Sequence, residues 1–223
     1  MGVWGYECTP TLPYSHTFAT MNPILLEFPD SFDTERLTIR APRPGDGAQV
    51  AEALRESIAE LRAWMPFARD EPTVEGNEAW VRQAAANWIA RKDLPMLLFL
   101  KGGGTLVGSS GLHRFDWDIG KFEIGYWVRT KFAGQGYISE AVDGISRFAF
   151  AHLKANRVEI RCDVNNVRSA AVARRCGFRL EGILRNDDRG VDGELRDTRV
   201  FSKISPTEFH TYDVPPTDGD YVE

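Results

Sequence analysis

The chain has 223 residues, of which 43% are hydrophobic and 26% charged, a composition typical of a globular protein that is long enough to bury a core. Its formal net charge of -5 argues against a nucleic-acid-binding surface that extends over the whole molecule. No stretch approaches the length of a membrane span and the first residues lack the pattern of a secretion signal, so we expect a cytoplasmic protein that binds neither nucleic acid nor a membrane.

The two ends of the chain are predicted to be arms outside the folded core. Residues 1–33 contain scattered prolines without hydrophobic periodicity, and residues 205–223 are acidic and proline-rich. One domain is therefore expected to span residues 34–204.

The first half of this domain begins with a strand and two helices. TERLTIRA, residues 34–41, alternates like a strand, and Asp46 is a candidate N-cap for a helix from Gln49 through Met65. Helical spacing returns over residues 78–90.

The hydrophobic period then changes to two. Residues 95–100 and 105–115 are predicted to form a hairpin around KGGG, and KFEIGYWVR, residues 121–129, is predicted to be the next strand. Its alternation divides the side chains between two faces, with Phe122, Ile124, Tyr126 and Val128 on one and Glu123, Gly125 and Trp127 on the other.

A glycine pair separates this strand from an amphipathic helix that extends to about residue 152. The next strand, 157–164, is expected to lie parallel to strand 121–129, because a strand, a helix and a strand form a right-handed crossover. A short helix, 167–176, is predicted to end at Gly177, and strands near 178–185 and 195–203 complete a mixed sheet.

The glycine pair, Gly134 and Gly136, is a weak signal alone, because a tight strand-to-helix turn also requires glycine. A dinucleotide fingerprint would require a third glycine where Ser139 stands, and no Gly-Lys-Ser/Thr follows as in a Walker A loop. The remaining functional interpretation is an anion site at a helix N-terminus.

Several motifs taken together resemble the GNAT superfamily of N-acetyltransferases, in particular its ribosomal-protein-alanine branch, which acetylates protein N-termini. The resemblance is carried by RLTIRAPRPGD, LRAWMP, EIGYWV, KFAGQGY and NVRSAAVARRCGFRLEG, and it covers residues 34–203. It implies an α/β fold of the α+β type, with a mixed, mostly antiparallel sheet, one splayed parallel strand pair and helices on both faces.

The resemblance also implies acetyl-coenzyme A as the donor, bound between the splayed strands with its pyrophosphate on the glycine loop. Lys131 stands where the family has Arg or Gln. The implied coenzyme-binding residues are Tyr126, Trp127, Val128, Lys131, Phe132, Ala133, Gly134, Gln135, Gly136, Tyr137, Asn166 and Ser169. Asn166 has the alternative interpretation of a helix N-cap.

Two catalytic residues follow from the same resemblance. Glu123 is the candidate general base, and its alternative is a solvent-facing or ion-paired sheet residue. Many family members place a tyrosine at the position of Ala173 to protonate the departing thiolate, whereas in the N-terminal-acetylating branch a serine does so, and Ser169 matches it. The alternative for Ser169 is a local helix-start residue.

The acceptor site is less defined. Trp64 and His113 are candidate substrate contacts, with a core aromatic and a structural histidine as the alternatives. Three arginines of the short helix are candidates for binding the 3′-phosphate of the coenzyme, with a solvated helix face as the alternative: Arg168, Arg174 and Arg175.

The cysteines exclude other chemistry. Cys8, Cys162 and Cys176 are too few and too scattered for a disulfide framework or a Cys-x-x-Cys site, so a reducing compartment and no metal are expected. No histidine pattern accompanies them, which argues against an acyl-cysteine intermediate.

The predicted function is direct acetyl transfer to a protein or peptide N-terminal amine. Near pH 7 an α-amine with a pKa of about 8 loses its proton for roughly 1 to 1.5 kcal/mol, whereas a lysine costs nearly 5 kcal/mol. One alternative is acetyl transfer to a small amine, such as a polyamine, an aminoglycoside or a peptide antibiotic. The others are a non-catalytic acyl-CoA sensor and a nucleotide-binding domain. The oligomeric state, including a homodimer, stays open.

Overall fold

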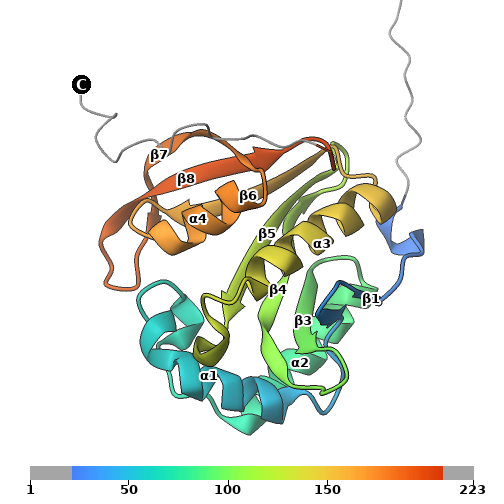
Figure 1. Ribbon diagram of the computed structural model, residues 1–223, viewed down its shortest axis with the longest axis vertical. Coiled ribbons are helices and arrows are strands. Elements are labelled where there is room, and N and C mark those ends of the chain that lie inside the picture. The colour runs from blue at the N-terminus through green and yellow to red at the C-terminus, as the bar shows by residue number, and fades with distance from the viewer. Residues whose placement is uncertain (1–21, 208–223) are drawn as a thin grey trace, which may run out of the picture.

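The computed structural model of the chain describes residues 22–207 (Figure 1). Most of both terminal arms predicted from the sequence lies outside the described residues. In the part of the chain that is described, no helix is long and apolar enough to cross a membrane.

The central sheet has eight strands in the order β1-β2-β3-β4-β5-β6-β8-β7. All neighbouring strands are antiparallel except β5 and β6, which are parallel. The strands are β1 (Ser31–Asp33), β2 (Leu37–Arg40), β3 (Leu94–Leu100), β4 (Leu106–Asp116), β5 (Lys121–Val128), β6 (Arg157–Asp163), β7 (Arg179–Arg189) and β8 (Leu195–Lys203). The predicted mixed sheet with one parallel pair is confirmed.

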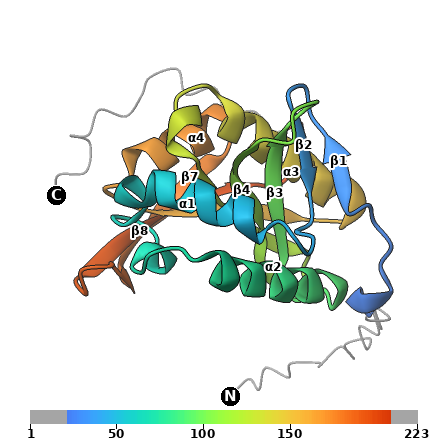
Figure 2. The same cartoon turned by 90° about the horizontal axis from the view of Figure 1, so that it is seen from below.

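Within residues 22–207, four α-helices and three short 3₁₀ helices complete the fold. They are η1 (Pro23–Leu25), α1 (Gly47–Leu61), η2 (Pro66–Ala68), α2 (Val74–Ile89), η3 (Thr130–Phe132), α3 (Tyr137–His152) and α4 (Val167–Arg175). Helix α3 crosses one face of the sheet beside α4, and Figure 2 shows α1 and α2 together on the other face. Helices therefore cover both faces, as the sequence predicts.

Each face of the sheet has its own hydrophobic core. One core joins α3 and α4 to the sheet and contains Phe122 and Ile124, and the other joins α1 and α2 and receives Trp127. The predicted alternation along β5 is thus confirmed, and it places Glu123 on the same face of the sheet as α1 and α2.

The elements predicted from the sequence differ from the structure mainly at their ends. Strand β1 was not predicted, because three residues are too few to show alternation; β1 pairs with β2, and Phe28 and Phe32 pack against the core. Helix α1 ends at Leu61 rather than at Met65, since Met65 precedes Pro66 and is extended, with φ -117° and ψ 113°.

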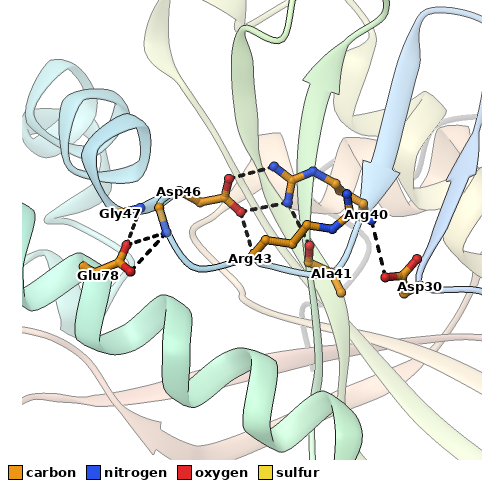
Figure 3. Close-up of polar contacts among 8 residues, drawn as sticks. Asp30, Arg40, Ala41, Arg43, Asp46, Gly47 and Glu78 are labelled. Carbon is orange, nitrogen blue, oxygen red and sulfur yellow. Dashed lines mark hydrogen bonds and ion pairs between the residues drawn. The ribbon is translucent and has the colours of Figure 1, made fainter.

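Asp46 occupies the predicted N-cap position of α1, but its side chain does not cap the helix. Its two carboxylate oxygens instead accept hydrogen bonds from the Arg40 guanidinium, both at 2.7 Å, and one also accepts the Arg43 backbone N–H at 2.7 Å (Figure 3). The cap interaction comes from α2, where Glu78 accepts the backbone N–H of Gly47 at 3.2 Å.

We expect Asp46→Asn to lower the free energy of unfolding by about 2 kcal/mol at pH 7, because it breaks a largely buried, charge-assisted pair with Arg40. Burial raises the pKa of Asp46, but the hydrogen bonds from Arg40 and Arg43 lower it more, so the pKa lies below its ordinary value. The stabilisation is therefore present above pH about 4 and is lost as the pH falls through the lower folded-state pKa. Urea denaturation at several pH values measures both effects.

Asp30→Asn is the matched control for Asp46→Asn. Asp30 pairs with Arg43 at 3.3 Å, and both side chains are more than half exposed, so its loss should cost less than about 1 kcal/mol (Figure 3). Equal losses for the two variants would contradict the assignment of Asp46 as the stabilising partner.

Candidate functional site

Strands β5 and β6 separate within the sheet. Their parallel pairing covers the register from Lys121–Arg157 to Glu123–Glu159, and no later β5–β6 pair occurs in the described chain. Because β5 stays paired to β4 as far as Val128, its other edge leaves backbone groups without a strand partner beyond Glu123. Such an edge can pair with an extended ligand as an added strand would.

Beyond the point where the strands separate, Tyr126 of β5 contacts the first turn of α4. Its hydroxyl lies 3.0 Å from the Ser169 hydroxyl and donates to the Ser169 carbonyl, also at 3.0 Å. Burial raises the pKa of Tyr126 far above its ordinary value, so this phenol stays protonated. Two predicted site residues that lie 43 positions apart in the sequence therefore meet.

Helix α4 holds Ser169 through a capped first turn. Asn166 is the N-cap, and its side-chain oxygen accepts the Ser169 backbone N–H at 3.0 Å. At the other end Gly177 has φ +77°, with its N–H bonded to the Arg174 carbonyl. The N-cap interpretation of Asn166 is thus confirmed, and the hydroxyl of Ser169 is not used for capping.

The glycine loop lies just beyond the end of β5, where it leads into α3. Gly134 and Gly136 have φ +74° and +82°, conformations that side chains other than glycine rarely adopt. Gly136 is the N-cap of α3 without a side-chain cap, and a Cβ atom on Gly134 would meet no other atom within 4 Å. No side chain therefore caps the first N–H groups of α3, which a phosphate site would use.

One side of the loop is held by Arg36 from the start of β2. The guanidinium donates to the Gln135 carbonyl at 3.0 Å, lies 4.3 Å from the centre of the Tyr137 ring and pairs with Glu140 at 2.6 Å. Glu140 also accepts the Thr34 hydroxyl at 2.6 Å. The loop is therefore fixed to the far edge of the sheet.

The other side of the loop is held by α1. Arg129 is buried and donates to Glu52 and Glu56, and the Thr130 N–H donates to the Ser57 hydroxyl at 2.9 Å. Sequence reasoning missed these braces because each joins positions about 70 or 100 residues apart. The only local signal for these contacts in the sequence was the position of Arg36 at the start of the RLTIRA motif.

Glu123 lies at the last paired position before the strands separate. Its side chain is 16% exposed, and Arg114 donates to it at 3.2 Å. Burial raises the pKa of Glu123, and the nearby charges of Arg114 and Arg161 offset part of that rise. A carboxylate with a raised pKa is better suited to accept a proton than an exposed one.

His113 lies directly across the β4–β5 pair from Glu123. The structure thus brings one predicted substrate residue next to the predicted base.

Trp64, in contrast, lies in the turn after α1 and is 39% exposed, so it is not a core aromatic. Near this turn, Arg69 donates to the Val191 carbonyl at 3.2 Å, and the α1–α2 connection thereby meets the β7–β8 turn.

The remaining predicted coenzyme residues surround the loop. Phe132 contacts the edge of the Tyr137 ring, and the Gln135 side chain donates to the Lys131 carbonyl. Lys131 also lies 3.6 Å from Glu56, while Val128 packs against the core.

The three arginines of α4 have different surroundings. Arg168 is exposed, Arg175 donates to the Ser139 hydroxyl in the first turn of α3, and Arg174 lies over the Phe201 ring. Of the three, Arg175 is therefore the one that contacts the first turn of α3.

The cysteines are poor nucleophiles in this fold. Cys162 and Cys176 are buried, and burial raises the pKa of both thiols, that of Cys176 to about 11. Because the thiolate is the reactive form, this supports direct transfer over an acyl-cysteine route.

Comparisons with known proteins agree with this geometry. A model of the acetyltransferase (GNAT) domain matches residues 36–179. The protein YdaF of Bacillus subtilis (strain 168), named provisionally as a ribosomal N-acetyltransferase, is 33% identical over 174 residues, 76% of this chain and 92% of that protein. The ribosomal-protein-serine acetyltransferase of Escherichia coli (strain K12) is 36% identical over 145 residues, 63% of this chain and 75% of that protein.

The fold also matches solved structures. The microcin C7 self-immunity acetyltransferase MccE, crystallised with acetyl-CoA and AMP, superposes with a TM-score of 0.73 at 21% identity. The match covers 80% of this chain and 98% of that one. At this identity the match supports the fold.

Proposed function

This chain belongs to the acetyltransferase (GNAT) family, and on that basis we propose that it acetylates the α-amine of a protein or peptide N-terminus. As a family member it is an acyltransferase that uses acetyl-coenzyme A as the donor. The carrying observation is the separation of β5 from β6 directly after Glu123, with the Tyr126–Ser169 hydroxyl pair joining β5 to α4 just beyond it.

The residues fit the donor. The unpaired edge of β5 suits the extended pantetheine chain, and the uncapped first N–H groups of α3 with Gly134 and Gly136 suit a pyrophosphate. When bound, the coenzyme supplies an activated acetyl thioester. The protein then has to orient the acceptor amine, accept its protons and provide one proton to the thiolate.

We assign these proton transfers to two residues. Glu123 accepts a proton from the amine, directly or through a water molecule, because it is a largely buried carboxylate on the sheet face that α1 and α2 cover. Ser169 provides the proton for the thiolate, because its hydroxyl lies beside that of Tyr126 on β5 and is not consumed by helix capping.

The acceptor assignment is supported by the relatives and by proton energetics. Two relatives carry names that refer to ribosomal acetylation, and one of them names a serine acceptor. An α-amine also gives up its proton near pH 7 at much lower cost than a lysine side chain. Trp64 and the junction of Arg69 with the β7–β8 turn are candidates for the wall of the acceptor site.

An acceptor screen tests this proposal. Thiol release from acetyl-CoA is measured with peptides that differ in their first residue, with their N-blocked forms, and with polyamines and aminoglycosides. We expect transfer to free peptide N-termini and none to blocked ones. Preferential transfer to a small amine would overturn the acceptor assignment, and tight coenzyme binding without any transfer would indicate a sensor.

We expect Arg36→Met to raise the Kd for acetyl-CoA by about tenfold, which corresponds to roughly 1.4 kcal/mol. The reason is that the substitution removes the contacts of Arg36 with Gln135, Tyr137 and Glu140, which hold the loop. Isothermal titration measures the Kd. Arg147→Met is the matched control, since Arg147 is 66% exposed and pairs only with Asp143 on its own helix in the described chain. An unchanged Kd in Arg36→Met would contradict the bracing role.

A further inference from the structure

A histidine–aspartate pair lies beside Glu123. His113 Nδ1 is 2.6 Å from Asp93 Oδ1, and Asp93 stands in the connection before β3. A carboxylate oxygen accepts hydrogen bonds, so we assign the ring hydrogen to Nδ1, which leaves Nε2 of the neutral ring as an acceptor. Residues 22–207 provide no hydrogen-bond partner for Nε2.

Two glycines make room for this imidazole. Gly111 and Gly125 are paired across β4 and β5, and a Cβ atom on Gly111 would lie 3.2 Å from His113 Nε2. On Gly125 it would lie 3.2 Å from Cδ2 and 3.5 Å from Nε2. The ring therefore lies over the glycine pair, with Nε2 above both glycines and Cδ2 on the side of Gly125 in β5.

The charged groups around the ring complete the site. Glu123 is the cross-strand neighbour of His113, Arg114 binds Glu123, and Asp93 holds the opposite ring nitrogen. The β4–β5 register shifts directly after His113, and Arg114 has φ +47°. Bulges of this kind redirect side chains next to active sites.

We propose that His113, oriented by Asp93, accepts the first proton of the acceptor ammonium group at Nε2. This inference rests on the proposed acetyl transfer and assigns a second proton acceptor to the same site. The imidazolium that forms is stabilised by the Asp93 carboxylate. His113 is thereby a catalytic residue and Asp93 a positioning residue.

The proposed transfers balance the protons of the reaction. An ammonium acceptor loses two protons as its C–N bond forms and the thioester C–S bond breaks, and the thiolate regains one. With His113 taking the first proton before attack and Glu123 the second after it, one proton goes to the thiolate through Ser169 and one to solvent. No oxidant or further reactant is needed.

The test uses His113→Gln and Asp93→Asn in the full chain. We expect each to lower kcat with a saturating peptide by about 10²-fold and to change the KM for acetyl-CoA by less than about twofold. Asparagine presents an N–H group to Nδ1, so Asp93→Asn should also move the ring hydrogen to Nε2. Nitrogen-15 NMR reads this tautomer directly, with the His113 signal identified by its loss in His113→Gln.

His152→Gln is the matched control, because His152 is exposed at the end of α3 and outside the described site, and its kcat should stay at the wild-type value. Wild-type kcat in His113→Gln, or an Nε2–H tautomer in the unmodified protein, would overturn the proposed role of His113 and Asp93 in proton transfer. The proposed acetyl transfer would be unaffected by either result. Absence of transfer to any amine by the unmodified protein would instead overturn the proposed function, and the proton role with it. Urea denaturation confirms that both variants are folded.

Discussion

Glu123→Gln is expected to lower kcat by about 10²- to 10⁴-fold while the Kd for acetyl-CoA stays within about twofold of the wild-type value. The glutamine keeps the shape of the side chain but cannot accept a proton. Because the glycine loop and the unpaired edge of β5 are unchanged, donor binding should persist. Stopped-flow thiol release and isothermal titration measure the two quantities separately.

The stability of this variant adds a second readout. Burial raises the folded-state pKa of Glu123, so the folded protein binds a proton more tightly there than the unfolded chain does. Stability therefore falls as the pH rises through the window between the unfolded and folded pKa values, and the ionised carboxylate lowers stability at pH 7. We expect Glu123→Gln to be at least as stable as the wild type at neutral pH.

This pair of results separates the two interpretations of Glu123. A purely structural ion pair with Arg114 predicts lower stability and normal turnover, the reverse of the expected result. Glu75→Gln, an exposed carboxylate in the first turn of α2, is the control and should retain turnover. Normal turnover in Glu123→Gln would contradict the role of Glu123 as the general base.

The fold could be predicted where local periodicity is strong. The alternation of β5 assigned Glu123 and Trp127 to one face correctly, and Gly177 marked the end of α4. Where a side chain has two possible partners, local rules were insufficient: Asp46 stands at an N-cap position, but the Arg40 guanidinium binds its carboxylate. A charge-assisted bidentate pair outweighs a single cap hydrogen bond.

The site could be predicted where its residues lie within a motif. Examples are Glu123, which lies where the strands separate, and Ser169, which lies beside Tyr126. The Asp93–His113 pair and the Arg36–Glu140 brace were not predicted, because each contact is created by strand pairing or by packing between distant segments. A single sequence contains no periodic signal for contacts of that kind, so tertiary structure is required to find them.

Ser169→Ala is expected to lower kcat by about 10²-fold with little change in stability. The substitution removes the hydroxyl next to Tyr126, and the proton donor is lost with it. Two interactions should remain: the residue 169 N–H still donates to Asn166, and its carbonyl still accepts the Tyr126 hydroxyl. Helix α4 therefore keeps its cap, and the change in rate reports on chemistry.

Two further variants make the interpretation of Ser169 unambiguous. Asn166→Ala removes the cap itself and should cost about 1 kcal/mol of stability by urea denaturation, the loss that Ser169→Ala is expected to avoid. Tyr126→Phe removes the neighbouring hydroxyl and leaves Ser169 in place, so its kcat should fall less than that of Ser169→Ala. A larger loss in Tyr126→Phe would transfer the proton-donor role to Tyr126, because its hydroxyl lies 3.0 Å from that of Ser169.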